Sequence, residues 1–401
     1  MPLRPDTEQG QPMKRARVML AIRTLSGAGA ELVVETLATG LDPKRFDVTV
    51  CELVGVGEKG ERLRRLGYEV TSLLPGGNGR GAYANFLRLR RLVAERQIEL
   101  IHSHSPATLA DAALCRCLRP GVKILHTFHF GNYPHLDRSA RRLERTFAGF
   151  ADRMVAVGHG QAATICDTYG WRPERLQVIW NGIHPRPARI DRQSLTSHVP
   201  EGHAIIGMVG TLIAQKGHTD MFEVAGRLKK AGVPATFLVV GGGSLQAALE
   251  AQCRALGLDE TVKFLGWISD AAEAILPGID IFFQPSRWEA MSMVLLEAAA
   301  CGLPIVCTDV GEAPRILDRG AEAIMTSPGD VSAMTDALMK LVADPSLRRR
   351  LGQAARSKVL STCTADTMVR QYEHLYLDML AHRQVTPAAF ERPGTRAQGR
   401  L

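Results

Sequence analysis

The stretch PSRWEAMSMVLLEAAACGLPIV (residues 285–306) indicates the fold of this chain. The apolar run IDIFFQPS leads into it, and its middle carries the apolar pattern of a helix from about Met293 to Ala300. A glycine and a proline then end the helix, and the β-branched run PIVCTDVG follows. A strand, a helix and a strand at this spacing are typical of parallel strands joined by a helical crossover.

The same alternation continues on both sides of this stretch. Short β-branched runs such as RVMLAI, FDVTVCEL and VKILHTFH are each followed by an amphipathic segment. A polar, Pro- and Arg-rich segment at His184–His203 interrupts the pattern, which restarts at AIIGMVG. We therefore predict an α/β fold with two Rossmann-like, doubly wound parallel-sheet domains. Ligands of such sheets bind beyond the strands' carboxyl ends, so we expect the two domains to face a ligand-binding cleft. The predicted boundaries are 1–183 for the first domain, 184–203 for a linker, 204–363 for the second domain, 364–385 for a helix that returns to the first domain, and 386–401 for a flexible tail.

Composition and charge narrow the possible environments of the chain. No run approaches the roughly 18 apolar residues that a membrane span needs, and the first residues are polar, so we expect a cytoplasmic protein. The eight cysteines are scattered without paired spacing, which predicts reduced thiols. Residues 1–185 hold 26 basic and 18 acidic side chains, which accounts for the whole formal net charge of +8. This excess suggests an anionic partner such as the inner membrane surface, whereas no nucleic-acid module is recognisable.

Two acids, Glu289 and Glu297, flank the start of the helix in the opening stretch. The first amides of that helix, from Ala290, Met291, Ser292 and Met293, would be unpaired donors and form an anion site. Eight helical positions span on the order of 12 Å, so the two carboxylates would hold the two ends of one extended ligand rather than act as a pair. The alternative is that they are ordinary surface charges at a helix start.

Two further loops can approach an anion. GMVGTLIAQKGH (residues 207–218) places Lys216 just before a helix, and TLSGAGAELVVETL places Gly27 and Gly29 before another. Glycine permits close approach of a ligand to the backbone, and lysine supplies compact positive charge. A plain tight turn remains the alternative for each loop.

Histidines gather at two strand ends, in IHSHS and LHTFHFGNYP. His102 and His104 share one strand face, so a metal site is conceivable. Since no carboxylate or cysteine stands at ligand spacing, we predict no metal.

Together these segments resemble the GT-B-fold retaining glycosyltransferases of family 4, which transfer a sugar from a nucleotide diphosphate sugar. EAMSMVLLEAAACGLPIV resembles the family's Glu-x7-Glu signature, and IWNGI resembles its strand at the domain hinge. FLGWISD, VVGGGSL and TDVGEAPRIL resemble three of its loops, in the same order. The resemblance covers about residues 17–380. It implies the GT-B arrangement, with residues 1–183 on the acceptor side and residues 204–363 binding the nucleotide sugar.

The resemblance implies roles for particular residues. Glu297 would bind the ribose, Glu289 the transferred sugar, and Lys216 the diphosphate. His129 would lie at the reacting centre as a positioning group or proton partner, while the leaving phosphate deprotonates the acceptor. No cofactor or metal would be required. The remaining substrate-binding residues would be Gly27, Gly29, Thr211, Trp267, Ile268, Ala290, Met291, Ser292 and Met293.

The chain departs from the family pattern at a few positions. Thr211 stands where the family often has an arginine on the diphosphate, so one charge-assisted contact is missing. Arg287 or Arg23 could replace it. His184 and Ala290 stand where aspartate and glycine are common.

The sequence thus predicts a retaining glycosyltransferase that extends a saccharide or lipid-linked acceptor in envelope or exopolysaccharide synthesis, peripheral to the membrane. Two alternatives remain: a GT-B-type nucleotide-sugar epimerase, and a non-catalytic nucleotide-sugar-binding scaffold.

Overall fold

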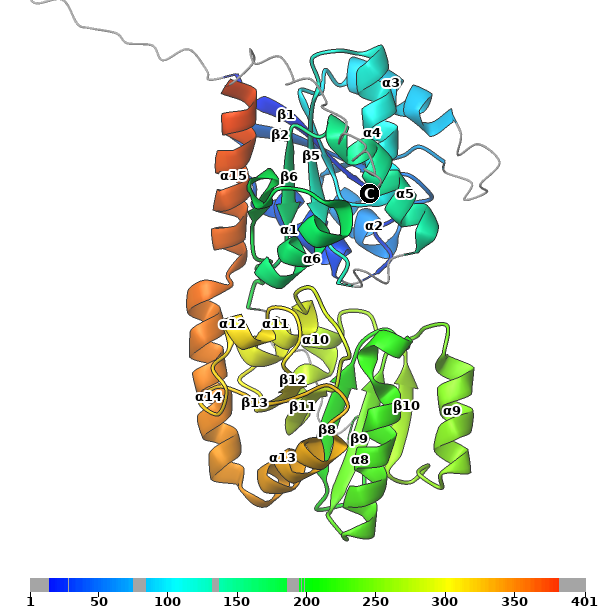
Figure 1. Cartoon of the computed structure of the whole chain (residues 1–401), viewed down its shortest axis with the longest axis vertical. Helices are drawn as coiled ribbons and strands as arrows, with labels where there is room; N and C mark the ends of the chain where they lie inside the picture. The colour runs from blue at the N-terminus through cyan, green and yellow to red at the C-terminus, as the bar shows by residue number, and fades with distance from the viewer. Residues whose placement is uncertain are drawn as a thin grey trace, which may run out of the picture.

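A computed structural model describes residues 14–27, 29–74, 84–131, 137–185, 195, 197 and 199–381. It confirms the predicted fold class of two parallel-sheet α/β domains (Figure 1). Parts of the predicted linker (186–194, 196 and 198), the end of the predicted last helix and the whole predicted tail lie outside the described residues. Among the described residues, no helix is long and apolar enough to cross a membrane.

The N-terminal domain is built on a seven-stranded parallel sheet in the order β3-β2-β1-β4-β5-β6-β7. Residues of the central strand alternate between two cores: Val18 and Leu20 pack on one face, and Met19 and Ala21 on the other. Both faces are therefore buried, as expected of a doubly wound sheet. The strands are β1 Ala16–Ile22, β2 Phe46–Glu52, β3 Glu69–Ser72, β4 Leu100–Ser103, β5 Lys123–Phe128, β6 Arg153–Ala156 and β7 Leu176–Val178.

Helices cover both faces of this sheet. Those that contribute to the first core are α1 Ala30–Gly40 and α2 Glu58–Arg65, together with the final helix α15 Ala365–Ala381. The opposite face is covered by α3 Asn85–Glu95, α4 Pro106–Leu118, α5 Arg138–Phe147 and α6 His159–Tyr169.

The C-terminal domain has a six-stranded parallel sheet in the order β10-β9-β8-β11-β12-β13. Its strands are β8 Ala204–Val209, β9 Ala235–Val240, β10 Val262–Gly266, β11 Ile281–Gln284, β12 Ile305–Thr308 and β13 Ile324–Thr326. The sequence analysis did not predict β13, which has only three residues. The helices are α8 His218–Lys230, α9 Gln246–Ala255, α10 Ala271–Ala274, α11 Met293–Ala300, α12 Ala313–Ile316, α13 Val331–Ala343 and α14 Pro345–Thr362.

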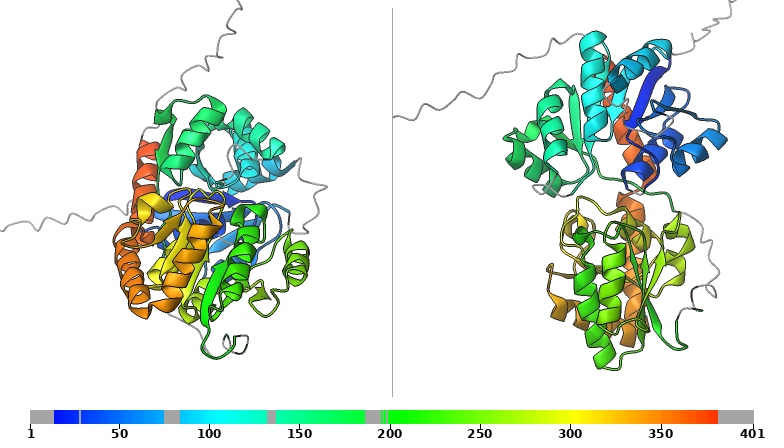
Figure 2. Two further views of the ribbon diagram at one scale, coloured as in Figure 1. Left: turned by 60° about the horizontal axis from the view of Figure 1, so that its bottom comes forward. Right: turned by 90° about the vertical axis from the view of Figure 1, so that its right-hand side faces the viewer.

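The chain passes between the domains twice, and the two passages lie side by side. The Ile183 N–H donates to the Cys363 carbonyl at 3.0 Å, and the Ala365 N–H donates to the Ile183 carbonyl at 2.9 Å. We call residues 181–184 and 362–365 the hinge. Helices α14 and α15 continue from the hinge along the two domains (Figures 1 and 2).

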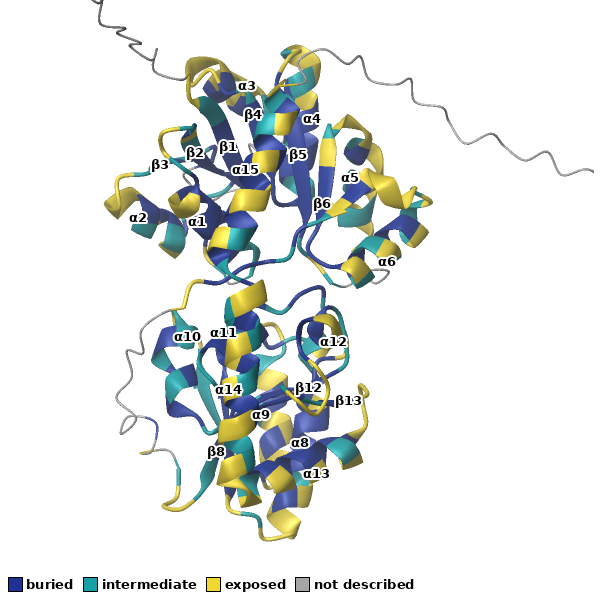
Figure 3. Ribbon diagram, turned by 90° about the vertical axis from the view of Figure 1, so that its left-hand side faces the viewer, coloured by how far each residue is buried: buried dark blue, intermediate teal, exposed yellow. Residues whose placement is uncertain are grey.

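One apolar core is continuous through the hinge. It joins Tyr372 and Tyr376 of α15 to Ile183 of the hinge and to Leu295 and Leu296 of α11. Helix α15 also carries Glu373, which accepts a hydrogen bond from the Asp42 N–H at 2.8 Å. The last helix is therefore part of the N-terminal domain, and Figure 3 shows buried and exposed stretches along α15.

The strand order reverses direction between β1 and β4 in one sheet and between β8 and β11 in the other. Ligands of doubly wound sheets bind at such points, beyond the carboxyl ends of the strands. Loops that follow these ends in the two domains contact each other, because Gly131, after β5, packs against the Glu289–Ala290 peptide, after β11. The fold therefore brings both predicted ligand-binding edges together where Gly131 meets residues 289–290, and we call this place the junction.

Candidate active site

The loop between β11 and α11, residues 285–292, is the centre of the candidate site, and we call it the donor loop. Glu289 Oε1 lies 2.6 Å from Lys216 Nζ, and their side chains are only 8% and 16% exposed. Glu289 also accepts hydrogen bonds from Ser286 Oγ at 2.8 Å and Gln215 Nε2 at 3.2 Å. The structure thus brings together Lys216 and Glu289, which the sequence analysis had assigned to neighbouring parts of one ligand.

Helix α11 begins at Met293, as predicted. Ser292 caps it, because its Oγ accepts from the Leu295 N–H at 3.4 Å and donates to Gln284 Oε1 at 2.8 Å. Among the described residues, the N–H groups of Ala290, Met291, Ser292 and Met293 donate no hydrogen bond. These four N–H groups lie at the start of α11 or just before it, where backbone donors lack a partner within the helix. They can therefore bind an anion.

The loop after β8 is packed tightly against the donor loop. Gly217 has φ +72°, and a Cβ atom there would lie 1.9 Å from the Pro285 carbonyl oxygen, so only glycine fits. Gln215 donates to the Trp288 carbonyl at 2.9 Å, and its own carbonyl accepts from the Arg287 N–H at 2.7 Å. This backbone contact fixes where Lys216 meets Glu289.

The other predicted donor-side residues lie at the same edge of the sheet. Thr211 follows β8 and is exposed, and Glu297 is half-buried on α11. The eight positions from Glu289 to Glu297 are not all helical, contrary to the expectation, because α11 begins only after the donor loop. Trp267 and Ile268 follow β10, and Trp267 is 53% exposed. The indole of Trp267 is thus available to a ligand.

Arg287 is paired with a carboxylate of its own domain. Its Nη2 atom donates to Asp220 Oδ1 at 2.7 Å and to Thr219 Oγ1 at 3.3 Å, in the first turn of α8. Arg23 is exposed in the loop that follows β1. The site therefore contains Lys216 as the cation beside the donor loop, and Arg287 is already engaged with a carboxylate.

In the N-terminal domain, the loop after β1 ends at α1. Gly29 precedes the helix with φ +90°, and α1 has no side-chain cap. The Glu31 carboxylate lies over Gly27, where a Cβ atom would be 3.0 Å from Glu31 Oε1. Burial raises the pKa of Glu31, against the opposing effects of its own backbone N–H and of Lys59.

Four histidines meet at the carboxyl ends of β4 and β5. His104 Nδ1 lies 2.9 Å from His129 Nε2, and the two rings are stacked. His102 contacts Tyr376 and Thr127 at 2.7 Å each, and His126 Nδ1 lies 3.1 Å from the Ser103 carbonyl. Burial lowers the pKa of His126 and His129 to about 3 and holds those of His102 and His104 well below their usual range, so all four imidazoles are neutral.

The hydrogen-bond network assigns the tautomers of the central pair. Among the described residues, His104 Nε2 is buried without a hydrogen-bond partner. A buried N–H without an acceptor is rare in proteins, so this atom carries the lone pair and His104 donates from Nδ1. His129 therefore accepts at Nε2 and carries its proton on Nδ1, which makes that atom a hydrogen-bond donor.

Within the described residues, no group of three or more His, Cys, Asp or Glu side chains is arranged to hold a metal ion. The histidines instead form hydrogen bonds with one another and with neighbouring hydroxyl and carbonyl groups.

Several residues of the site had been assigned no role from the sequence. Gln215 and Ser286 orient Glu289, and His104 orients His129. Gly131 touches the donor loop so closely that a Cβ atom there would lie 2.1 Å from the Ala290 nitrogen. Glu312 is one of two acids in TDVGEAPRIL, and nothing in the sequence indicated that it is fully buried.

The chain matches two family models and known relatives. Residues 190–358 match the family described as Glycosyl transferases group 1, and residues 27–186 match Glycosyltransferase Family 4. The 2-deoxystreptamine N-acetyl-D-glucosaminyltransferase of Streptomyces fradiae is 31% identical over 385 residues, which cover 90% of each chain. The N-acetyl-alpha-D-glucosaminyl L-malate synthase of Bacillus anthracis is 27% identical over 298 residues, which cover 72% of this chain and 77% of that relative.

Solved structures show the same fold. HepE from Anabaena, in complex with UDP and glucose, superposes with a TM-score of 0.80 at 20% identity, over 91% of this chain and all of that one. A sucrose-phosphate synthase from Thermosynechococcus elongatus gives a TM-score of 0.76 at 19% identity, over 92% of this chain and 100% of that one.

Proposed function

The chain belongs to the family 4, group 1 glycosyltransferases, and from this premise we propose that it moves a sugar from a nucleotide diphosphate sugar to a saccharide or lipid-linked acceptor with retention of configuration. The observation that carries the proposal is the donor loop. Within the part of the chain that the structure describes, the amides of residues 290–293 donate no hydrogen bond, and Lys216 is paired with the adjacent Glu289. This arrangement suits a diphosphate, whose charge grows as the sugar departs.

Each side of the junction has a role in the proposed reaction. Lys216 and the amides of 290–293 stabilise the departing diphosphate, Glu289 holds the transferred sugar, and Glu297 binds the ribose. Trp267 and Ile268 contact the base, Thr211 lies near the phosphates, and Gly27 and Gly29 allow close approach from the N-terminal domain. None of these steps uses a metal or a cofactor.

His129 acts at the acceptor side of the junction. With its proton on Nδ1 and its Nε2 occupied by His104, it donates a hydrogen bond to a substrate oxygen. Deprotonation of the acceptor hydroxyl then falls to the leaving phosphate, which departs on the same face. A neutral donor at this position is consistent with the low pKa of His129.

The first experiment is a thermal-shift panel of UDP-, GDP-, ADP- and TDP-sugars, because a ligand that binds the native state raises its melting temperature. The stabilising donor is then tested for transfer to saccharide and polyprenyl-phosphate-linked acceptors, with the anomeric configuration of the product read by NMR. Stabilisation by none of the four donors, or an inverted product, contradicts the proposal.

Arg287 motivates a second candidate, a non-catalytic homologue that binds a nucleotide sugar as a scaffold. Its ion pair with Asp220 leaves the place of the usual arginine to Thr211. Replacement of Glu289 or Lys216 separates the two candidates, since a scaffold's cellular phenotype would be unchanged by either. A GT-B-type epimerase would convert the donor without any acceptor, which the same transfer assay detects.

We also propose that α3, α4 and α5 face an anionic membrane surface that carries the acceptor in envelope or exopolysaccharide synthesis. These helices present exposed leucines together with arginines, a combination that suits the interface of anionic lipids. The exposed residues include Leu87 at 48%, Leu114 at 37%, Leu118 at 48% and Phe150 at 41%, beside Arg90, Arg91 and Arg142.

Flotation tests the membrane proposal. We expect the protein to float with phosphatidylglycerol vesicles at low salt and to be released at high salt, because surface charges are screened. A Leu114→Ser, Leu118→Ser variant should float less, while Leu256→Ser on the other domain should not differ from wild type. Binding that is equal for neutral and anionic vesicles would contradict it.

A further inference from the structure

Glu312 is a buried carboxylate whose hydrogen bonds cross from one domain to the other. It belongs to the loop between β12 and α12 of the C-terminal domain, and it is 0% exposed. Its Oε1 atom accepts from the Gly160 N–H at 2.9 Å, and its Oε2 atom accepts from Trp180 Nε1 at 3.0 Å. Gly160 and Trp180 come before the hinge residues 181–184 in the chain, so both donors belong to the N-terminal domain.

The bond to Gly160 supplies a helix cap. Helix α6 begins at His159, and its N-cap, Gly158, has no side chain to satisfy the first amides. A carboxylate at this position satisfies an orphan donor and interacts favourably with the helix dipole. Gly158 makes room for it, because a Cβ atom there would lie 2.5 Å from Glu312 Cγ. A helix of one domain is thus capped by the other.

The backbone of the same residue reaches the donor loop. The Glu312 N–H donates to the Ala290 carbonyl at 3.0 Å. The preceding Gly311 packs on the same peptide, with a hypothetical Cβ atom 2.5 Å from the Ala290 oxygen. Ala290 supplies the first of the four amides proposed for the diphosphate. One residue therefore connects the start of α6, the edge of the hinge and the donor loop.

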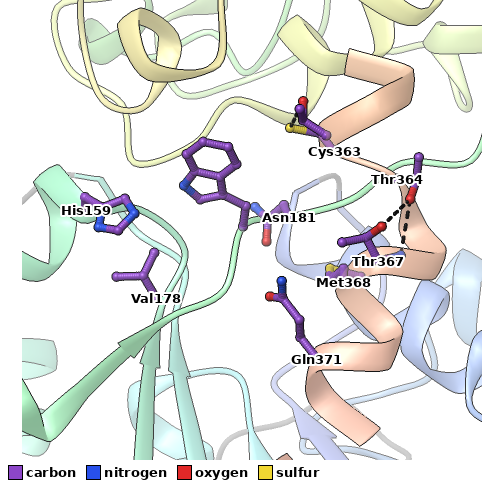
Figure 4. A pocket seen from close by; sticks show the side chains of 10 residues that line it. His159, Val178, Asn181, Cys363, Thr364, Thr367, Met368 and Gln371 are labelled. Carbon is purple, nitrogen blue, oxygen red and sulfur yellow. Dashed lines mark hydrogen bonds between the residues drawn. The ribbon is translucent and has the colours of Figure 1, made fainter. Parts of the chain in front are cut away.

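The hinge beside Glu312 is incompletely filled. A hollow of about 230 Å³ lies between its two passages and is lined by His159, Trp180 and Asn181 on one side and by Thr364 and Thr367 on the other. Figure 4 shows His159 and Asn181 across this hollow from the residues at the start of α15. The hollow thus lies at the place where the two passages of the hinge meet α6 and α15.

We propose that Glu312 is a positioning residue that holds the N-terminal domain against the donor loop during transfer, by capping α6 from the other domain. When the domains are together, its carboxylate has both donors. When they separate, it loses both hydrogen bonds and keeps only its ion pair with Arg315 of its own domain, at 3.5 Å, so the two cross-domain hydrogen bonds favour the joined state. The His129 side and the Glu289 side of the site are then held in register. The role of Glu312 in transfer rests on the proposed transferase function, whereas its capping of α6 does not.

Hydrogen exchange of the ligand-free full chain tests whether Glu312 caps α6. In Glu312→Ala we expect the amides of residues 160–163 to exchange about tenfold faster than in wild type, because the cap is lost. Glu312→Gln keeps one acceptor and should have a smaller effect. The control is Glu322→Gln, whose carboxylate accepts from the Asp318 N–H in its own loop and should not affect α6. Unchanged exchange of α6 in a folded Glu312→Ala protein would overturn the proposal.

If Glu312→Ala does not fold, Trp180→Phe provides the test, because it removes only the indole donor. We expect it to increase exchange at the start of α6 by a smaller factor, and additive effects of Trp180→Phe and Glu312→Gln in the double variant would refute a shared contact.

Kinetics test the positioning role. With UDP as the probe, we expect Glu312→Ala to bind within about threefold of wild type, because the UDP contacts lie in the C-terminal domain, while kcat falls by about tenfold or more. Equal losses of UDP affinity and kcat would instead show a general weakening of the donor site. If the wild-type protein transfers no sugar, the proposed function fails, and the hydrogen-exchange result still decides the role of Glu312.

Discussion

At the scale of single residues, the site depends on charges that satisfy one another before any substrate arrives. Lys216 and Glu289 are paired at 2.6 Å with little exposure, although each is proposed to contact a different part of the donor. Donor binding must therefore exchange one buried interaction for another. Before the donor binds, the ion pair with Lys216 and the hydrogen bonds from Ser286 and Gln215 keep Glu289 oriented.

Replacement of Lys216 separates the structural from the catalytic part of this pair. We expect Lys216→Met to destabilise the fold by about 2–3 kcal/mol, since it leaves a buried carboxylate without its cation. Adding Glu289→Gln should recover most of this loss in urea unfolding, while transfer stays reduced by about 10²-fold or more. Additive losses of stability in the double variant would show that the two side chains do not interact.

The His104–His129 hydrogen bond leads to a second prediction. An asparagine places its amide near the position of Nδ1, and a glutamine places it near that of Nε2, so only His104→Asn can preserve the bond to His129. We expect kcat to fall by about tenfold or more in His104→Gln and much less in His104→Asn. The two variants have similar polarity, so equal activities would show that His104 does not orient His129.

The buried histidines also make stability depend on pH. Their pKa values in the folded state are lowered, to about 3 for His126 and His129, from the usual 6.5. The unfolded chain therefore binds more protons below pH 6.5, and stability is lost as the pH falls from about 6.5 toward 3. His126→Asn removes one such group and should reduce the slope of unfolding free energy near pH 5 by about 1.4 kcal/mol per pH unit. An unchanged slope in urea titrations would contradict neutral burial of His126.

At the scale of elements, loops determine the site more than helices do. Gly131 follows β5 and rests on the Glu289–Ala290 peptide, where a methyl group would meet backbone atoms at 2.1–2.3 Å. Backbone atoms cannot move aside as a flexible side chain can. The distance between the acceptor side and the donor loop is therefore set by the absence of a side chain at this position.

Gly131→Ala should push the two loops apart without unfolding either domain. We expect kcat to fall by about tenfold or more, with unchanged circular dichroism, since small displacements of reacting groups are costly. Gly226→Ala is the matched control, because its Cβ atom on α8 would meet nothing within 4 Å. Activity of Gly131→Ala equal to that of Gly226→Ala would show that this contact does not set the spacing.

Sequence patterns predicted the elements well and the contacts between them poorly. Helix α11 begins and ends at the predicted residues because a polar loop and a Cys-Gly pair bound its apolar run. Strand β13 was missed because three residues carry no periodicity. The pairing of His104 with His129, and that of Glu312 with Gly160, join segments that meet only once the sheets and domains are assembled.

At the scale of the whole molecule, two doubly wound domains are joined by one continuous core and by contacts between the loops at their facing edges. The hinge is formed by two chain passages, and α15 returns to the first domain, so each domain is held to the other by both passages. We propose above all that this junction binds a nucleoside diphosphate, with the phosphates at the start of α11.

The most direct test is a crystal structure of the chain with the nucleoside diphosphate that stabilises it most in the thermal-shift panel. We expect phosphate oxygens within hydrogen-bond distance of the 290–293 amides and of Lys216 Nζ, with the ribose hydroxyls at Glu297. A diphosphate bound at the hinge hollow or elsewhere, with those amides facing the protein's own atoms, would contradict it.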